Sequence, residues 1–298
     1  MLQYIRLFRY KNLLTLAFML LVFHFGFLKL QNIELALKDW QFLLFILATI
    51  LVFGAGNLMN AIIDFENINT KNHENSLIGN TFSESNANTL YIILNRLGGG
   101  IGFYLSNVIG KPNFASLFII IAVINYFTVS TLAKNSPIRL FLNALMPAIS
   151  LISVGIFDII PTLNQENTVG LLLLFKILLD YAIFTFLIHL LIEILENLEI
   201  VITKKSWLIN QKSASFIGIL LVLGNLFYIY KYLFANQLYS SVLYFIITMI
   251  SPLIYILIPL LTDKKQTEFR TISYICKVVF FFGIISIFLI TLNIKHYV

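Results

Sequence analysis

The chain has 298 residues, of which 59% are hydrophobic and only 11% are charged. A water-soluble protein of this length must cover itself with polar groups, so the composition excludes a soluble globular protein and indicates a polytopic membrane protein. The net charge of +6 is spread between apolar runs, which argues against nucleic-acid binding. The single Cys276 excludes an internal disulfide and a cysteine-based metal cluster.

Apolar runs dominate the sequence from end to end. A transmembrane helix needs roughly 20 mainly apolar residues. Nine runs meet this requirement, at about 12–30, 41–63, 89–109, 114–133, 139–160, 169–195, 213–234, 238–261 and 271–293. The sequence therefore predicts an all-α membrane bundle with nine transmembrane helices, forming a single domain over residues 1–298.

The basic residues between these runs predict the orientation. Lys and Arg are more numerous in the segments that become cytoplasmic when the N-terminus is inside. An odd number of spans then places the C-terminus outside. The two longest loops, about 64–88 and 196–212, both face the cytoplasm in this topology.

Acidic residues occur at the cytoplasmic ends of the second and sixth runs. Asp64 and Glu66 end the second run, and Glu193, Glu196 and Glu199 end the sixth. Carboxylates from two helices on one membrane face are suited to a pair of magnesium ions that bridge to substrate phosphates. Solvated helix ends are the alternative, and the pattern alone favours them.

Charged residues inside the spans also need an explanation, because they are costly in a membrane. Lys176 and Asp180 are spaced i, i+4 in the sixth run and are expected to form a structural ion pair. Arg96 in the third run either extends to the membrane interface or reaches a phosphate in a cavity. His189 is expected to be a hydrogen-bonded packing residue.

Four segments carry a resemblance to a known family. They are "RYKNLL" from Arg9, "NAIIDFENINTKNHENSLIG" from Asn60, "NALMPAISLISVGIFD" from Asn143 and "YAIFTFLIHLLIEILENLEI" from Tyr181. In order and spacing they resemble the UbiA superfamily of intramembrane prenyltransferases. The second segment resembles the first acidic motif of that family, and the fourth runs into its second acidic motif.

The resemblance implies that a polyprenyl diphosphate binds through Mg²⁺ held by the two acidic motifs. Ionisation of the diphosphate would give an allylic cation, which an aromatic ring or a hydroxyl group attacks. By resemblance, Asp64 is the catalytic residue. The metal ligands would be Asn60, Asp64, Glu66, Glu193 and Asn197, and the substrate contacts would be Arg9, Asn12, Lys71, Arg96 and Lys204.

Both motifs depart from the family pattern. In the first motif, Ala61 and Ile68 occupy positions where acids are expected. In the second, an ungapped register keeps Glu193 and puts Asn197, Ile200 and Lys204 at acid positions. A shift of one residue would instead bring Glu196 and Glu199 onto the motif, so the register stays open. On the ungapped register, Lys204 is a candidate to bind diphosphate directly in place of part of the metal's charge.

The leading interpretation is an integral-membrane prenyltransferase of the UbiA type. It would transfer a polyprenyl group to an aromatic or lipid hydroxyl acceptor at the cytoplasmic face of a bacterial inner membrane. The close alternative is a catalytically silent paralogue, a pseudoenzyme that binds isoprenoid lipid or a membrane partner. A distant alternative is a small-solute transporter that uses Lys176 and Asp180, although no clear internal repeat supports it.

Overall fold

The computed structural model of the chain describes residues 8–66, 78, 83–132, 136–164, 167–201, 207–261 and 269–297. Within these ranges, the side chains at positions 64, 66, 197–201, 207–212 and 295–297 are left out of the description. All regular secondary structure in the described part is helical.

The helical elements follow the apolar runs in order. They are α2 (Tyr10–Leu21), the π-helical η1 (Val22–Leu28), η2 (Lys29–Gln31), α3 (Asp39–Glu66), α5 (Glu84–Val108), η4 (Pro112–Ala115), α6 (Ser116–Ser130), α7 (Pro137–Asp158), η5 (Ile160–Thr162), α8 (Thr168–Val201), α9 (Trp207–Ala235), α10 (Tyr239–Phe245), the π-helical η6 (Ile246–Ile250), α11 (Ser251–Leu261) and α12 (Phe269–Tyr297). The all-α architecture expected from the sequence is confirmed.

Eight helices in the described part of the chain are long and apolar enough to cross a membrane. The chain is therefore an integral membrane protein. The sequence predicted nine spans, and the difference is α5. This helix is 25 residues long, but it includes Arg96, several asparagines and a run of glycines, so its composition is less apolar than that of the others.

The chain divides into two compact units. Unit 1 consists of Met1–Leu21, Glu34–Leu142 and Ser153–Leu172, and unit 2 consists of Val22–Ile33, Asn143–Ile152 and Leu173–Val298. The expectation of one domain over residues 1–298 stays a prediction.

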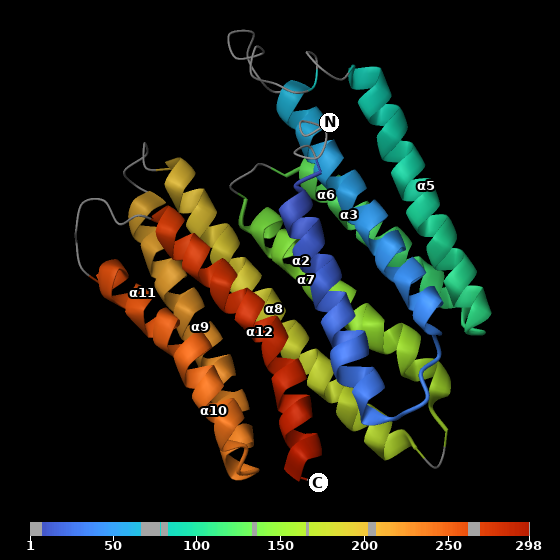
Figure 1. Cartoon of the computed structure of the whole chain (residues 1–298). Helices are drawn as coiled ribbons and strands as arrows, with labels where there is room; N and C mark the ends of the chain where they lie inside the picture. The colour runs from blue at the N-terminus through green and yellow to red at the C-terminus, as the bar shows by residue number, and fades with distance from the viewer. Residues whose placement is uncertain are drawn as a thin grey trace. The chain divides into compact units, whose positions relative to one another are not determined.

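Unit 1 is organised around α3, which packs against α5 and α6 (Figure 1). Helices α3 and α5 run antiparallel and approach closely at Gly98, where an added Cβ would lie 2.9 Å from the backbone oxygen of Ala48. The rings of Phe45, Phe118 and Phe157 form a mutually contacting aromatic cluster. Aromatic burial and a glycine contact therefore fix how α5 and α6 pack on α3.

Unit 2 is organised around α12, which contacts α10, α11 and both π-helical segments. The ring of Phe184 packs where a side chain at Gly283 would be, since an added Cβ there would lie 2.4 Å from the ring. One turn further along α12, the hydroxyls of Tyr181 and Ser286 are hydrogen bonded at 2.8 Å, and both residues are buried. This bond fastens α8 to α12.

Candidate functional site

The C-terminal part of α3 in unit 1 has a polar side and an apolar side. Asn57 and Asn60 are one turn apart on the polar side. The amide of Asn57 donates from Nδ2 to the carbonyl oxygen of Phe8 at 2.9 Å, which fastens the segment before α2 to α3. The amide of Asn60 donates from Nδ2 to the carbonyl oxygen of Gly56 at 3.2 Å.

Arg139, in the first turn of α7, contacts this polar side. Its Nη2 donates to Oδ1 of Asn60 at 2.8 Å, and its Nη1 donates to the carbonyl oxygen of Leu132 at 2.9 Å. Arg139 is only 8% exposed. The sequence did not reveal this buried guanidinium beside Asn60.

The apolar side of α3 explains one departure from the motif. Ala61, at a position where an acid is expected, packs against the buried cluster of Leu58, Ile62, Ile78 and Ala87. A carboxylate here would be placed against hydrocarbon, which disfavours the charged form strongly. The alanine therefore fits the packing of α5 on α3.

The other expected substrate contacts in unit 1 occupy exposed positions. Arg9 precedes α2 and adopts a left-handed backbone conformation, with φ 48°, that costs a non-glycine residue about 1–2 kcal/mol. The carbonyl oxygen of Arg9 accepts from the amide of Asn12 at 2.9 Å, and both side chains are exposed. Arg96 in α5 is also exposed. Their roles as substrate contacts stay predictions.

In unit 2, Glu193 of α8 has a partner on α7. Nδ2 of Asn143 donates to Oε2 of Glu193 at 3.4 Å, and Glu193 is partly buried. In the sequence, Asn143 is only the first residue of one of the four segments that resemble the family. It is a second residue whose contact could not be found from spacing, because 50 residues separate it from its partner.

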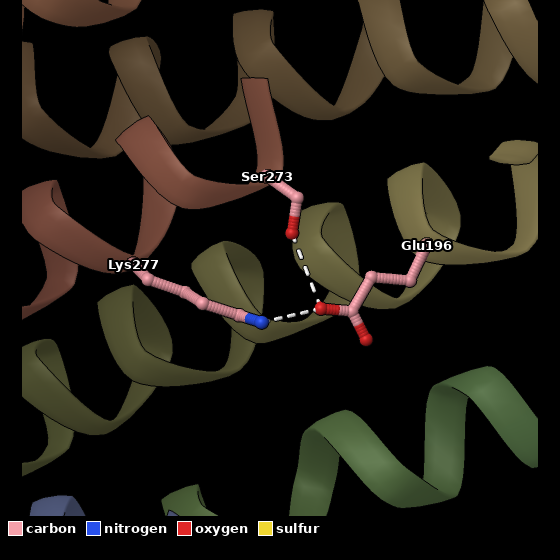
Figure 2. Close-up of polar contacts among 3 residues, drawn as sticks. All are labelled: Glu196, Ser273 and Lys277. Carbon is pink, nitrogen blue, oxygen red and sulfur yellow. Dashed lines mark hydrogen bonds and ion pairs between the residues drawn. The ribbon is translucent and has the colours of Figure 1, made fainter. Parts of the chain in front are cut away.

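Glu196, three residues after Glu193, contacts a different helix. Figure 2 shows its carboxylate facing Ser273 and Lys277 of α12. Lys277 Nζ lies 2.5 Å from Oε1 of Glu196, and Ser273 Oγ donates to the same oxygen at 3.2 Å. The carboxylate of Glu196 is thus compensated by a lysine.

Two expectations about α8 concern its polar residues within the apolar run. His189 is hydrogen bonded to the carbonyl oxygen of Thr185 at 2.8 Å and contacts the ring of Phe280, so its expected packing role is confirmed. Lys176 and Asp180 interact electrostatically one turn apart, with Lys176 exposed and Asp180 partly buried.

The contacts of several predicted site residues are outside the described part of the structure. Lys71 and Lys204 lie outside the described residues, as do the side chains of Asp64, Glu66 and Asn197. Helix α8 continues to Val201, so positions 193, 197 and 200 belong to one uninterrupted helix, as the ungapped register requires. The expectation that Asp64 and Glu193 serve one site stays a prediction.

The described side chains do not fit a magnesium pair. No three His, Cys, Asp or Glu residues come together among those that the structure describes. The amide oxygen of Asn60 already accepts from a guanidinium, and the carboxylate of Glu196 already faces an ammonium group. Mg²⁺ requires several oxygen ligands in octahedral geometry, and cations beside those oxygens oppose its binding.

The fold is similar to that of a solved prenyltransferase. The structure of digeranylgeranylglyceryl phosphate synthase in membranes matches with a TM-score of 0.63, covers 96% of each chain and shares 16% sequence identity. No protein-family model and no curated protein sequence matches the chain. The chain therefore has the fold of UbiA-type prenyltransferases, as the resemblance led us to expect.

Proposed function

We propose that this chain is an integral-membrane prenyltransferase that acts on a polyprenyl diphosphate. The observation that carries the proposal is the fold likeness over 96% of the chain to a digeranylgeranylglyceryl phosphate synthase. Because that identity is only 16%, function must be argued from the site. The polar side of α3, with Asn60 held by Arg139, supports a phosphate-binding role there.

In the proposed reaction, the bond between the allylic carbon and the diphosphate oxygen breaks, and the diphosphate leaves with the electron pair. The acceptor oxygen or aromatic carbon then forms a bond to the allylic carbon and loses a proton. Positive charge near the leaving diphosphate lowers the barrier to ionisation. Arg139 can provide such charge beside Asn60, and Asp64 is proposed as the catalytic residue that follows on α3.

The proposed setting is the cytoplasmic face of a bacterial inner membrane, with the N-terminus inside and the C-terminus outside. The acceptor would be an aromatic or hydroxyl-bearing lipid. Magnesium enters the proposal only through the family resemblance, and the side chains described above provide no fitting site for it.

A second function is a silent paralogue that binds isoprenoid lipid without transferring it. The observation that favours it is that Ala61 occupies an apolar cluster and Glu196 is paired with Lys277, so neither supplies a free carboxylate. Such a protein would still bind the prenyl chain but would release no diphosphate.

Transfer of radiolabelled geranylgeranyl diphosphate to a mixed pool of lipid and aromatic acceptors separates the two functions. The purified protein should form labelled product, and Asp64→Ala should abolish it while leaving the protein folded. Lys231→Gln, which removes an exposed charge from α9, is the control and should leave transfer unchanged. Saturable binding of the diphosphate without any product would refute the transferase and favour the silent paralogue.

A further inference from the structure

The position of Arg139 in unit 1 is unusual for a membrane protein. A guanidinium is expensive to bury, and charged residues in such surroundings are usually paired or functional. Arg139 is 8% exposed and donates a hydrogen bond to the amide oxygen of Asn60. This oxygen belongs to the residue that begins the first motif, so the charge is placed at the motif itself.

The contact with Arg139 determines what Asn60 can do. Only the carbonyl oxygen of an asparagine amide can ligate a metal, because the nitrogen carries hydrogen-bond donors. With 2.8 Å between Asn60 Oδ1 and Arg139 Nη2, an Mg²⁺ ion about 2.1 Å from the same oxygen would lie at most about 5 Å from the guanidinium. At this separation in a low-dielectric medium, the two cations repel each other strongly.

In unit 2, the contacts of Glu196 with Ser273 and Lys277 give a second case of a side-chain oxygen, here of a carboxylate, beside a cationic side chain (Figure 2). Glu196 is one of the acids that a shifted register would assign to the second motif. Its carboxylate oxygen Oε1 accepts from Lys277 and Ser273. In each unit, therefore, an oxygen of metal-binding type contacts a cationic side chain of the chain itself.

We propose that this chain binds the diphosphate of its prenyl substrate without a divalent metal, and that Arg139 supplies the positive charge beside Asn60 that a metal would otherwise provide. The inference rests on the proposed function and goes beyond it. Arginine suits this role because it stays charged at every physiological pH. The Asn60 contact and the Leu132 carbonyl hold the guanidinium in a fixed position, so its charge stays beside Asn60.

The direct test is equilibrium binding of radiolabelled geranylgeranyl diphosphate to the full chain in lipid nanodiscs. The titration is made once in excess EDTA and once in millimolar Mg²⁺. We expect the two dissociation constants to agree within about twofold. In EDTA, Arg139→Gln should weaken binding by about tenfold or more, because it removes the charge and keeps a hydrogen-bonding side chain.

Two further variants separate charge from folding. Arg139→Lys keeps the charge and should recover most of the lost affinity. Lys231→Gln makes the same charge change at an exposed position of α9 and should bind like the wild type. The EDTA comparison uses the wild-type chain alone, so it decides the metal question even when a variant at 139 does not fold.

Three outcomes overturn the proposal. Binding that needs Mg²⁺ and disappears in EDTA refutes metal independence but leaves the proposed function standing. Unchanged binding of a folded Arg139→Gln variant in EDTA refutes the role of Arg139. Absence of saturable binding under both conditions refutes this inference together with the proposed function.

Discussion

The close approach of α3 and α5 in unit 1 predicts how alanine substitutions in α5 change stability. Three consecutive glycines, Gly98 to Gly100, differ only in the atoms that an added Cβ would meet. An alanine Cβ at Gly98 would lie 2.7 Å from Val52 Cγ2 and 2.9 Å from the backbone oxygen of Ala48. At Gly99 and Gly100, the same Cβ would meet nothing within 4 Å. A backbone oxygen cannot rotate away, so α5 has to move back from α3 when Gly98 becomes alanine.

The expected magnitude follows from a matched pair, Gly98→Ala and Gly99→Ala. Both substitutions gain roughly 0.5–1 kcal/mol from replacing glycine in a helix, so this contribution cancels in the comparison. The remaining difference is the overpacking cost at Gly98, about 1–3 kcal/mol. We therefore expect Gly98→Ala to be less stable than Gly99→Ala by this amount.

Thermal unfolding of both variants in one detergent measures the difference. Since 1 kcal/mol corresponds to roughly 2–4 °C in a protein of this size class, the two melting temperatures should differ by several degrees. Melting temperatures that agree within error would refute the close packing of α5 on α3. They would also remove the support that α5 gives to the helix carrying Asn60.

Three other substitutions are expected to change stability. Lys277→Met should lower the free energy of unfolding by only about 0.2–1 kcal/mol, because the ion pair with Glu196 is about half exposed; a double-mutant cycle with Glu196→Gln checks this. Tyr181→Phe should cost about 0.5–1.5 kcal/mol through loss of the bond to Ser286, and a melting temperature equal to wild type would contradict it. Ala61→Asp should reduce stability by about 1–3 kcal/mol and should not make geranylgeranyl diphosphate binding dependent on Mg²⁺, which the nanodisc titration measures directly.

The helices themselves could be predicted from the sequence, because a membrane span must bury its backbone polar groups in its own hydrogen bonds and needs a long apolar run. The second run, expected at 41–63, is α3 over Asp39–Glu66, and the sixth, expected at 169–195, is α8 over Thr168–Val201. Both helices extend further at their C-terminal ends. Hydropathy marks where the apolar run stops, whereas a helix can continue into polar residues.

The polar contacts could not be predicted, because they join residues far apart in the chain. Nothing in the local sequence identified Arg139 as a partner of Asn60, 79 positions earlier, to which its guanidinium donates. Lys277 lies inside the apolar run at 271–293, but nothing in the local sequence identified Glu196, 81 positions earlier, as its partner. A charge within an apolar run indicates that a partner exists, and only the packing of helices tells which one.

The glycine-rich stretch of α5 is another case in which the sequence does not determine which residues contact a neighbouring helix. The segment from Gly98 to Gly102 contains four glycines, and small residues of this kind let helices approach closely. Of the residues in this run, Gly98 and Gly102 meet neighbouring atoms when a Cβ is added, whereas Gly99 and Gly100 do not. Which glycines contact another helix depends on the rotation of α5 about its axis, and the spacing of the glycines alone does not determine that rotation.

Release of inorganic diphosphate from geranylgeranyl diphosphate tests the proposed prenyl transfer most directly. The full chain in nanodiscs is supplied with a lipid extract as acceptor, and free diphosphate is measured together with prenylated product by mass spectrometry. Prenyl transfer predicts that diphosphate and product appear in equal amounts and that both disappear in Asp64→Ala. Saturable binding of geranylgeranyl diphosphate by the wild-type chain, with no diphosphate released in any acceptor pool, would contradict it.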